Sequence, residues 1–223
     1  MNIIIVGSGA VAAELTSYIK DHNKHTDPDN RLNILGYLDS AENIPKYWAK
    51  YKFERPVVGD AESYAVREDE RFIVGISNIP FREQIMAKLM ARGARIIGFT
   101  HYNTIIADSA VIGSGNIIYP NCIIGPNTVI GNNNLLTAYS FISHDCTVGD
   151  SNFLSTAGLS GNVRIGNYNY FGIRATVLPH VSIGNNNTIQ AGMIVDKDVA
   201  DNTTVFHRFK EKVMAIKSPS GNE

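Results

Sequence analysis

Residues 112–136 read IGSGNIIYPNCIIGPNTVIGNNNLL, and a branched aliphatic residue stands at every sixth position from Ile112 to Leu136. The same step extends back to Ile106 and forward to Leu154 without a break. Because only about a quarter of the residues in an ordinary chain are Ile, Val or Leu, a run of this length does not arise by chance. The run consists of Ile106, Ile112, Ile118, Ile124, Ile130, Leu136, Ile142, Val148 and Leu154.

A second run with the same step begins only five residues after Leu154, so the period is interrupted once. A period of six matches neither an α-helix nor a simple alternating strand, and tandem hexapeptides are typical of a parallel β-helix. We therefore expect triangular coils of about 18 residues, with the aliphatic side chains stacked inside a prism. The second run consists of Leu159, Ile165, Phe171, Val177, Ile183, Ile189 and Val195.

The N-terminal part of the chain has a different pattern, in which predicted strands and helices alternate. Strands are expected at residues 2–6, 32–38, 71–76 and 95–99, and helices at 11–20 and 80–92. Such alternation predicts a parallel sheet with crossover helices. The predicted fold class is thus α/β followed by all-β. Its parts are a small Rossmann-like βαβ domain at 1–101, a β-helix at 102–200 and a tail at 201–223, in which 206–217 form a basic segment compatible with a helix.

Composition and charge narrow the class of protein. The 223-residue chain has a net charge of −1 and 18% charged residues, so it lacks the basic surface that nucleic-acid binding needs. Its apolar segments are strand-sized, which predicts no membrane span, and residues 1–9 lack the basic leader and cleavage site of a secretory signal. Cys122 and Cys146 lie 24 residues apart, outside any metal-type pair. We expect a reduced, cytoplasmic protein.

A glycine-rich turn follows the first predicted strand. Residues 7–12 read GSGAVA and fit G-x-G-x-x-A at the opening of a helix, where backbone N–H groups can meet an anion. Asp39 ends the second predicted strand, where its carboxylate could accept hydrogen bonds from a ribose or a base. The competing interpretation is a tight turn that packs a helix on a sheet. The truncated sheet argues against a dinucleotide.

One histidine stands out within the repeats. His144 lies in Ser143-His144-Asp145-Cys146, at a position that elsewhere carries mostly Asn, Asp, Ser or Thr. A neutral imidazole suits proton removal near pH 7, and a neighbouring carboxylate would raise its basicity and hold its orientation. A direct His144–Asp145 hydrogen bond requires a corner, because adjacent strand residues face opposite ways. A lone surface histidine is the alternative. Cys146 is a weaker nucleophile candidate, since nothing basic nearby depresses its pKa.

Taken in order, these motifs resemble a family that covers nearly the whole chain. This family comprises the hexapeptide-repeat sugar acyltransferases: the sialic-acid O-acetyltransferase-like proteins and the N-acetyltransferases of nucleotide-linked 4-amino-6-deoxy sugars, such as the bacillosamine-pathway enzyme. The resemblance rests on Gly7-Ser8-Gly9, Tyr37-Leu38-Asp39, Val74-Gly75-Ile76-Ser77-Asn78 with Arg82, Ser143-His144-Asp145-Cys146, Gly161-Asn162-Val163-Arg164-Ile165-Gly166, Gly172-Ile173 and Val177-Leu178-Pro179.

The resemblance implies a left-handed β-helix, a homotrimer with active sites between adjacent prisms, and direct acyl transfer from acetyl-CoA without a metal. His144 would be the general base, supported by Asp145, and N–H groups near Gly161 would hold the oxyanion. The expected nucleotide-sugar ligands are Gly7, Ser8, Gly9, Asp39, Gly75, Ser77 and Asn78. The expected acyl-CoA contacts are Phe153, Gly161, Gly172, Ile173, Ala191 and Gly192.

Three departures from the family pattern stand out. Phe153 occupies the position of a second histidine that in many relatives bonds the acyl group, and the coil after Leu154 is one residue short. Both changes are expected beside the acyl pocket, so they bear on which acyl group is used. The tail reads FHRFK at 206–210 instead of a Gly-x-Pro-Ala-Lys-like sequence, which leaves the contacts to the adenosine end of CoA unassigned.

Other functions remain open at this stage. The same histidine could deprotonate a sugar hydroxyl, which would give an O-acetyltransferase. A hydratase resembling γ-carbonic anhydrases needs three histidines around one zinc, but His144 and His180 would lie two coils, or about 10 Å, apart. A non-catalytic scaffold would follow if Phe153 blocks the pocket. The sequence identifies neither the nucleotide (UDP, dTDP, GDP or CMP), nor the sugar, nor the glycan pathway.

Overall fold

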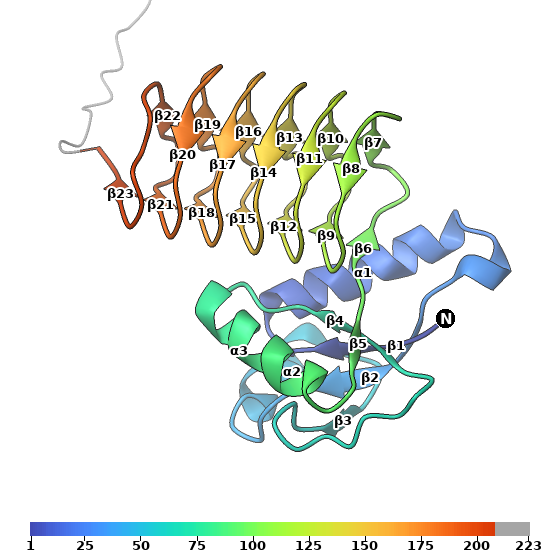
Figure 1. The fold of residues 1–223 in the computed structure, drawn as a ribbon. Coiled ribbons are helices and arrows are strands. Elements are labelled where there is room, and N and C mark those ends of the chain that lie inside the picture. The colour runs from blue at the N-terminus through green and yellow to red at the C-terminus, as the bar shows by residue number, and fades with distance from the viewer. Residues whose placement is uncertain (208–223) are drawn as a thin grey trace, which may run out of the picture.

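The computed structural model describes residues 1–207, which form an α/β domain beside a triangular prism (Figure 1). Nearly all of the predicted basic segment at 206–217 lies outside the described residues. The prism and the α/β domain meet along helix α1 (Ala10–Lys24), which lies between the N-terminal sheet and the prism (Figure 1). This helix therefore carries contacts from both parts of the molecule.

The N-terminal sheet is parallel and has five strands in the order β3-β2-β1-β4-β5. The strands are β1 (Asn2–Val6), β2 (Asn33–Leu38), β3 (Val57–Gly59), β4 (Arg71–Val74) and β5 (Arg95–Ile96). The remaining helices are α2 (Ile44–Tyr51), α3 (Ile79–Met90) and the short 3-10 helix η1 (Pro28–Asn30). The predicted βαβ organisation is confirmed. Strand β3 and helix α2 were not predicted, because both are too short to give a clear hydrophobic period.

Alternation along β1 explains why helices cover both faces of this sheet. Ile3 and Ile5 pack in a cluster with Leu15 of α1, while Ile4 and Val6 pack in a second cluster that contains α3. Side chains of a strand point to opposite faces in turn, so one apolar strand supplies two cores. The first cluster continues into the prism and joins the two parts of the molecule.

The prism consists of three parallel sheets, named here after one central strand each. The β15 face contains β6 (Phe99–Thr100), β9 (Ile117–Ile118), β12 (Leu135–Leu136), β15 (Phe153–Leu154), β18 (Tyr170–Phe171), β21 (Thr188–Ile189) and β23 (Thr204–Val205). The β13 face contains β7 (Ile105–Ile106), β10 (Ile123–Ile124), β13 (Phe141–Ile142), β16 (Gly158–Leu159), β19 (Thr176–Val177) and β22 (Ile194–Val195). The β14 face contains β8 (Val111–Ile112), β11 (Val129–Ile130), β14 (Thr147–Val148), β17 (Arg164–Ile165) and β20 (Ser182–Ile183).

The six-residue period lines the interior of this prism, as predicted. Each strand points its second residue inward, so Ile124 is buried while its neighbour Ile123 is exposed. Stacked strands lie one coil apart, as in the pairing of Ile124 with Ile142. The ladder extends past the predicted range of 102–200, because β6 pairs with β9 and β23 pairs with β21.

The interruption of the period is a shortened corner. Residues 155–157 connect β15 to β16. One coil earlier, the equivalent connection from β12 to β13 has four residues, 137–140. Thr156 ties the shortened corner to the corner one coil earlier. Its Oγ1 donates to the Ala138 carbonyl, and its N–H donates to Thr137 Oγ1. The stacking of Leu154 and Leu159 is preserved, and both side chains are fully buried.

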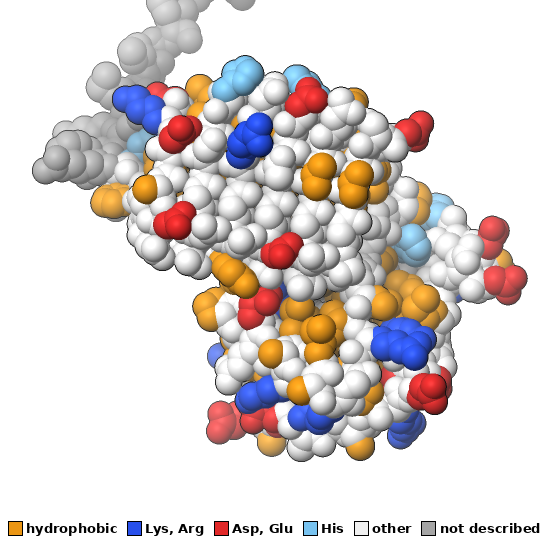
Figure 2. Space-filling view, viewed as in Figure 1, with side chains coloured by type: hydrophobic (Ala, Val, Ile, Leu, Met, Phe, Trp, Pro, Cys, Tyr) orange, Lys and Arg blue, Asp and Glu red, His pale blue; other side chains and the backbone are white. Residues whose placement is uncertain are grey.

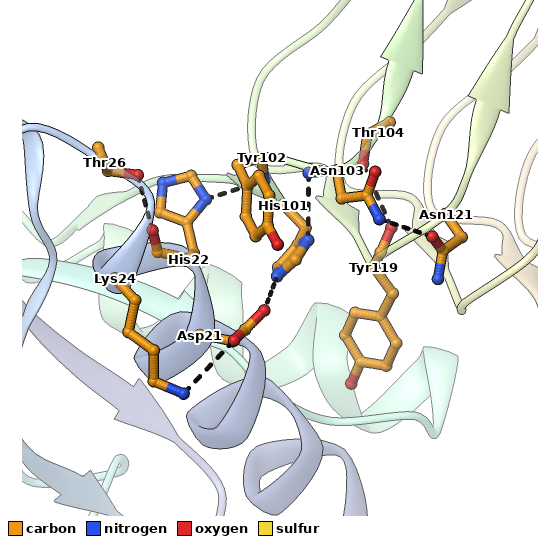
Figure 3. Close-up of polar contacts among 10 residues, drawn as sticks. All are labelled: Asp21, His22, Lys24, Thr26, His101, Tyr102, Asn103, Thr104, Tyr119 and Asn121. Carbon is orange, nitrogen blue, oxygen red and sulfur yellow. Dashed lines mark hydrogen bonds and ion pairs between the residues drawn. The ribbon is translucent and has the colours of Figure 1, made fainter.

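Polar contacts at the end of α1 fasten the two parts together (Figure 3). The Tyr102 N–H donates to His22 Nδ1 at 2.9 Å, and the Asn103 N–H donates to His101 Nδ1. His101 Nε2 lies 3.5 Å from an Asp21 oxygen. Burial lowers the pKa of both His22 and His101, so the junction favours neutral imidazoles. Helix α1 continues to Lys24 and half-buries the side chain of His22.

Candidate active site

The glycine-rich turn after β1 is shaped by close packing. Gly7 has φ 103°, and a Cβ there would lie 3.1 Å from the Gly75 carbonyl oxygen. A Cβ on Gly75 would in turn lie 3.1 Å from the Ala12 Cα. Gly9 differs, because no atom lies within 4 Å of the position its Cβ would take. Packing therefore explains Gly7 and Gly75, whereas the open space at Gly9 is free for a ligand.

Asp39 binds the turn itself. Its Oδ2 accepts hydrogen bonds from the Ser8 N–H, at 2.7 Å, and from the Ser8 hydroxyl. Its Oδ1 accepts from the Ser40 N–H and from Asn43 Nδ2. The sequence predicted that the turn's N–H groups meet an anion and that Asp39 accepts from a ligand. Instead, the Ser8 N–H donates to the Asp39 carboxylate. The reason is topological: β1 and β2 are adjacent parallel strands, so the turn after one lies beside the end of the other.

The N-terminus of α1 supplies the remaining backbone donors. Its N-cap residue Gly9 has no side-chain capping bond, and no acidic residue lies in the first turn. Uncapped N–H groups and the helix dipole make such a terminus favourable for an anion. Helix α3, in contrast, is capped by Asn78, whose Oδ1 accepts from the Phe81 N–H. Of these two helix termini, only that of α1 lacks a side-chain cap.

All seven expected nucleotide-sugar residues line one cleft at this edge of the sheet. The cleft has a volume of about 570 Å³, which is within the range of small-molecule sites. The seven residues are Gly7, Ser8, Gly9, Asp39, Gly75, Ser77 and Asn78. The cleft lies at the carboxyl ends of β1 and β4, where open parallel sheets bind ligands.

A second hollow, here called the interdomain groove, lies between α3 and the prism. It has a volume of about 800 Å³ and shares Ser77 and Asn78 with the cleft, so the two spaces adjoin. Figure 2 shows hydrophobic side chains gathered where the prism meets the N-terminal domain. The groove is lined by Ser77, Asn78, Ile79, Pro80, Glu83, Phe153, Tyr168, Tyr170, Asn186, Asn187 and Thr188.

Sequence reasoning missed most of the groove. Glu83 accepts a hydrogen bond at 2.6 Å from the Ser151 hydroxyl, across a separation of 68 residues. Phe153 packs edge-on against Tyr170, with ring centroids 5.3 Å apart. Phe153 and Tyr170 are paired one coil apart on the β15 face, but no sequence period links Glu83 with Ser151, because these two come from different domains. Only Phe153, Ser77 and Asn78 were singled out from the sequence.

His144 and Asp145 form a hydrogen-bonded pair at the corner between β13 and β14. His144 Nδ1 lies 2.8 Å from Asp145 Oδ2, and Asn127 Nδ2 donates to the other oxygen. Asp145 has φ 57°, which is the corner geometry that a direct bond requires. Hydrogen bonds from His144 and then Asn127 lower the pKa of the Asp145 carboxyl. Since the carboxylate accepts, Nδ1 carries the hydrogen and Nε2 keeps a lone pair.

Gly161 lies one coil further along, directly against the His144 ring. A Cβ on Gly161 would come within 2.6 Å of His144 Cε1 and 2.7 Å of Nε2, so only glycine leaves the imidazole in place. Within residues 1–207, no hydrogen-bond acceptor contacts the Gly161 N–H. The thiol of Cys146, by comparison, is buried and donates to the Ser160 carbonyl, and burial raises its pKa. This corner offers a base and a free N–H donor, but no thiolate.

The expected acyl-CoA residues are divided between two edges of the prism. Gly161 shares the β13–β14 edge with His144, whereas Gly172, Ile173, Ala191 and Gly192 follow β18 and β21 at the edge between the β15 and β13 faces. Phe153 lies on the β15 face, in the interdomain groove, and the shortened corner lies on the same edge as Gly172. Within one chain, Phe153, the shortened corner and the corner at Gly172 therefore lie away from His144, because the β13 face separates the two edges.

The β13 face presents apolar side chains outward. Ile105, Ile123 and Phe141 stack on successive strands and are between 43% and 65% exposed. Ile194 is also exposed, but Gly158 and Thr176 separate it from Phe141 in the ladder. An exposed apolar strip of this kind marks an interaction surface. Residues 1–207 contain no cluster of three or more His, Cys, Asp or Glu able to hold a metal. Among the same residues, no helix is long and apolar enough to cross a membrane.

Comparison with known proteins agrees with this architecture. Residues 103–138 match the bacterial transferase hexapeptide (six repeats) family. No curated protein matches the chain. The acetyltransferase domain of PglB from Neisseria gonorrhoeae has a similar structure, with a TM-score of 0.77 at 22% identity over 91% of this chain and 95% of that one.

Two further solved structures have the same two-part fold. A mutant of perosamine N-acetyltransferase from Caulobacter crescentus, in complex with CoA and GDP-perosamine, gives a TM-score of 0.75 at 21% identity, with 92% of each chain covered. WeeI from Acinetobacter baumannii gives 0.76 at 22% identity, over 93% of this chain and 97% of that one. The predicted fold, an α/β domain followed by a hexapeptide β-helix, is thereby confirmed.

Proposed function

We propose that the chain is an acetyl-CoA-dependent N-acetyltransferase that acts on the amino group of a nucleotide-linked amino-deoxy sugar, of the 4-amino-4,6-dideoxy class. The observation that carries this proposal is the His144–Asp145 pair, in which the imidazole ring packs against Gly161. An oriented imidazole beside a free N–H provides a general base and an oxyanion donor for acyl transfer. The fold shared with perosamine N-acetyltransferase supports this assignment.

In the proposed mechanism, the sugar amine attacks the thioester carbonyl of acetyl-CoA directly. His144 Nε2 takes a proton from the attacking nitrogen and returns it to the leaving thiol, while Asp145 holds the ring and stabilises the imidazolium. The Gly161 N–H donates to the carbonyl oxygen as it becomes an oxyanion, an interaction that is strongest in the transition state. The buried Cys146 takes no part.

The nucleotide is assigned to the cleft in the N-terminal domain. The open N-terminus of α1 would receive the diphosphate, and the space at Gly9 would allow it to approach the backbone. Asp39 keeps the turn in shape through Ser8. The sugar would then extend into the interdomain groove, since the two spaces share Ser77 and Asn78.

The proposed assembly is a homotrimer. The predicted contacts are divided between two edges of one prism, and an adjacent copy could bring His144 from one edge to the groove and the Gly172–Ile173 corner of its neighbour. The exposed apolar strip on the β13 face supplies a surface for this association. Both cysteines are free, which suits the reducing cytoplasm, where we place the reaction.

A thiol-release assay tests the proposal. Acetyl-CoA is mixed with the protein and a panel of UDP-, dTDP-, GDP- and CMP-linked sugars, each as a 4-amino form and a 4-hydroxy form. We expect CoA release with at least one amino sugar and none with its hydroxy counterpart. Faster release with the hydroxy forms would replace the proposal with an O-acetyltransferase. Absence of release with every sugar would overturn it.

A further inference from the structure

The interdomain groove has an uneven distribution of charge. Among the described residues that line it, Glu83 is the one charged side chain. The rest of the lining is aromatic, aliphatic, hydroxyl or amide. A carboxylate in the lining attracts a positively charged group. The adjoining cleft also contains carboxylates, those of Asp39, Asp60 and Glu62, but Asp39 already accepts hydrogen bonds from Ser8 and Ser40 and the cleft also presents the open N-terminus of α1.

The Glu83 carboxylate is held in place by the other domain. Its Oε1 accepts from the hydroxyl of Ser151, which is 1% exposed, while no hydrogen bond within residues 1–207 involves Oε2. The buried guanidinium of the preceding Arg82 interacts electrostatically with Glu83, but no hydrogen bond or ion pair within residues 1–207 joins the two side chains, and Arg82 Nε and Nη2 have no hydrogen-bond partner there. Glu83 therefore keeps one fixed oxygen and one oxygen available to a ligand.

Aromatic rings line the same groove as this carboxylate. Phe153 and Tyr170 meet edge to face, with an interplanar angle of 79°, and Tyr168 and Tyr170 remain partly exposed. An ammonium ion is attracted to aromatic faces, and its hydrogen bond to a carboxylate is charge-assisted. Carboxylate and aromatic rings together form a site for a cationic group attached to an apolar ring, which describes an amino-deoxy sugar.

We propose that Glu83 binds the acceptor amino group as an ammonium ion in this groove and thereby selects amino sugars over hydroxy sugars. This inference rests on the proposed function and adds the residue that recognises the acceptor. The overall reaction is R–NH3⁺ + acetyl-S-CoA → R–NH–acetyl + HS-CoA + H⁺. The ammonium releases one proton to solvent before attack. His144 takes a second proton from the attacking nitrogen and returns it to the CoA sulfur.

The test compares Glu83→Gln with Glu68→Gln, a matched change at an exposed residue that does not line the groove. We expect Glu83→Gln to raise KM for the amino-sugar nucleotide about 10- to 100-fold, because the amide oxygen can still accept but the ion pair with the ammonium is lost. KM for acetyl-CoA should stay unchanged, as should both constants in Glu68→Gln. An unchanged KM for the amino sugar would overturn the proposal.

Calorimetric binding of the 4-amino nucleotide sugar and of its 4-hydroxy counterpart gives a second readout that needs no turnover. Glu83→Gln should weaken only the amino form, and equal weakening of both forms would contradict selection by charge. If Glu83→Gln does not fold, Ser151→Ala keeps the carboxylate but removes its fixing bond, and a roughly 3- to 10-fold rise in the dissociation constant of the amino form is expected. No change in that variant would also overturn the proposal. Failure of the proposed acetyl transfer would appear separately, as absence of CoA release in the unmodified protein.

Discussion

In the prism, each two-residue strand pairs with the same position one coil away, whereas the N-terminal sheet joins strands of unequal length in the order β3-β2-β1-β4-β5. A corner of the prism can therefore carry a new side chain without disturbing the interior. The corner stack that contains Asp145 also contains Asn127, Asn162 and His180, all with positive φ. The chemistry of one coil is thus separable from the fold.

The cleft of the N-terminal domain has no such separation. A Cβ added at Gly7 or at Gly75 would lie 3.1 Å from a neighbouring backbone atom, and both oxygens of Asp39 accept hydrogen bonds from the turn and the following loop. Packing and ligand binding fall on the same residues here. The comparison teaches that variants in the prism can separate activity from stability, whereas most variants in the cleft change both.

The strongest test of this separation is His144→Asn. The base is removed, so turnover should fall by roughly 10²- to 10⁴-fold, while the melting temperature stays near that of the unmodified protein. His180→Asn is the matched control, because His180 is an exposed residue of the same corner stack and Asn tolerates its φ of 65°. Near-normal turnover in His144→Asn would remove the base assignment.

Alanine substitutions at two adjacent residues, Ile124 and Ile123, compare the interior of the prism with its outer surface. Ile124 is 1% exposed and Ile123 is 48% exposed. Ile124→Ala should lower the free energy of unfolding by about 2–5 kcal/mol, because it leaves a cavity in the packed interior. Ile123→Ala should change the unfolding free energy much less but weaken association of the copies, as measured by sedimentation. Equal destabilisation by both would contradict the inside–outside assignment.

Gly9→Ala probes the one cleft glycine that packing does not explain. Since no atom lies near its Cβ position and its φ is −78°, the variant should fold with a change below about 1 kcal/mol. The methyl group would occupy the space assigned to the diphosphate, so we expect KM for the nucleotide sugar to rise roughly tenfold. KM for acetyl-CoA should not change. A rise in both constants would argue against separate binding sites.

The smallest expected effect concerns the junction between the two parts. Burial lowers the pKa of His101 and of His22, so below about pH 6.5 the unfolded chain binds more protons than the folded one. The stability from these groups is fully present above that pH and is lost as the pH falls toward the folded pKa values. Urea unfolding from pH 7.5 to 5 should show this decline, and His101→Gln should reduce it. An unchanged slope in His101→Gln would contradict the assignment.

Features that depend on neighbouring residues could be predicted from the sequence, whereas contacts between distant segments could not. The period through Ile124 and Ile142 placed the interior correctly, since each coil repeats the same local rule. The turn at Gly7 and the pair at His144 were also recognised, because they are local in sequence. The bond between Ser8 and Asp39 and the contact between Ser151 and Glu83 were not, since each depends on segments far apart in the chain.

The most direct test of the central claim is the structure of the reaction product. Acetyl-CoA labelled with carbon-13 at the carbonyl is incubated with the protein and the 4-amino nucleotide sugar that releases CoA, and the product is examined by NMR. The account predicts an amide, with the labelled carbonyl correlated to an N–H proton and to the proton on the sugar carbon bearing that nitrogen. An ester, with the label correlated to the proton on the sugar carbon that carries the ester oxygen, would contradict it.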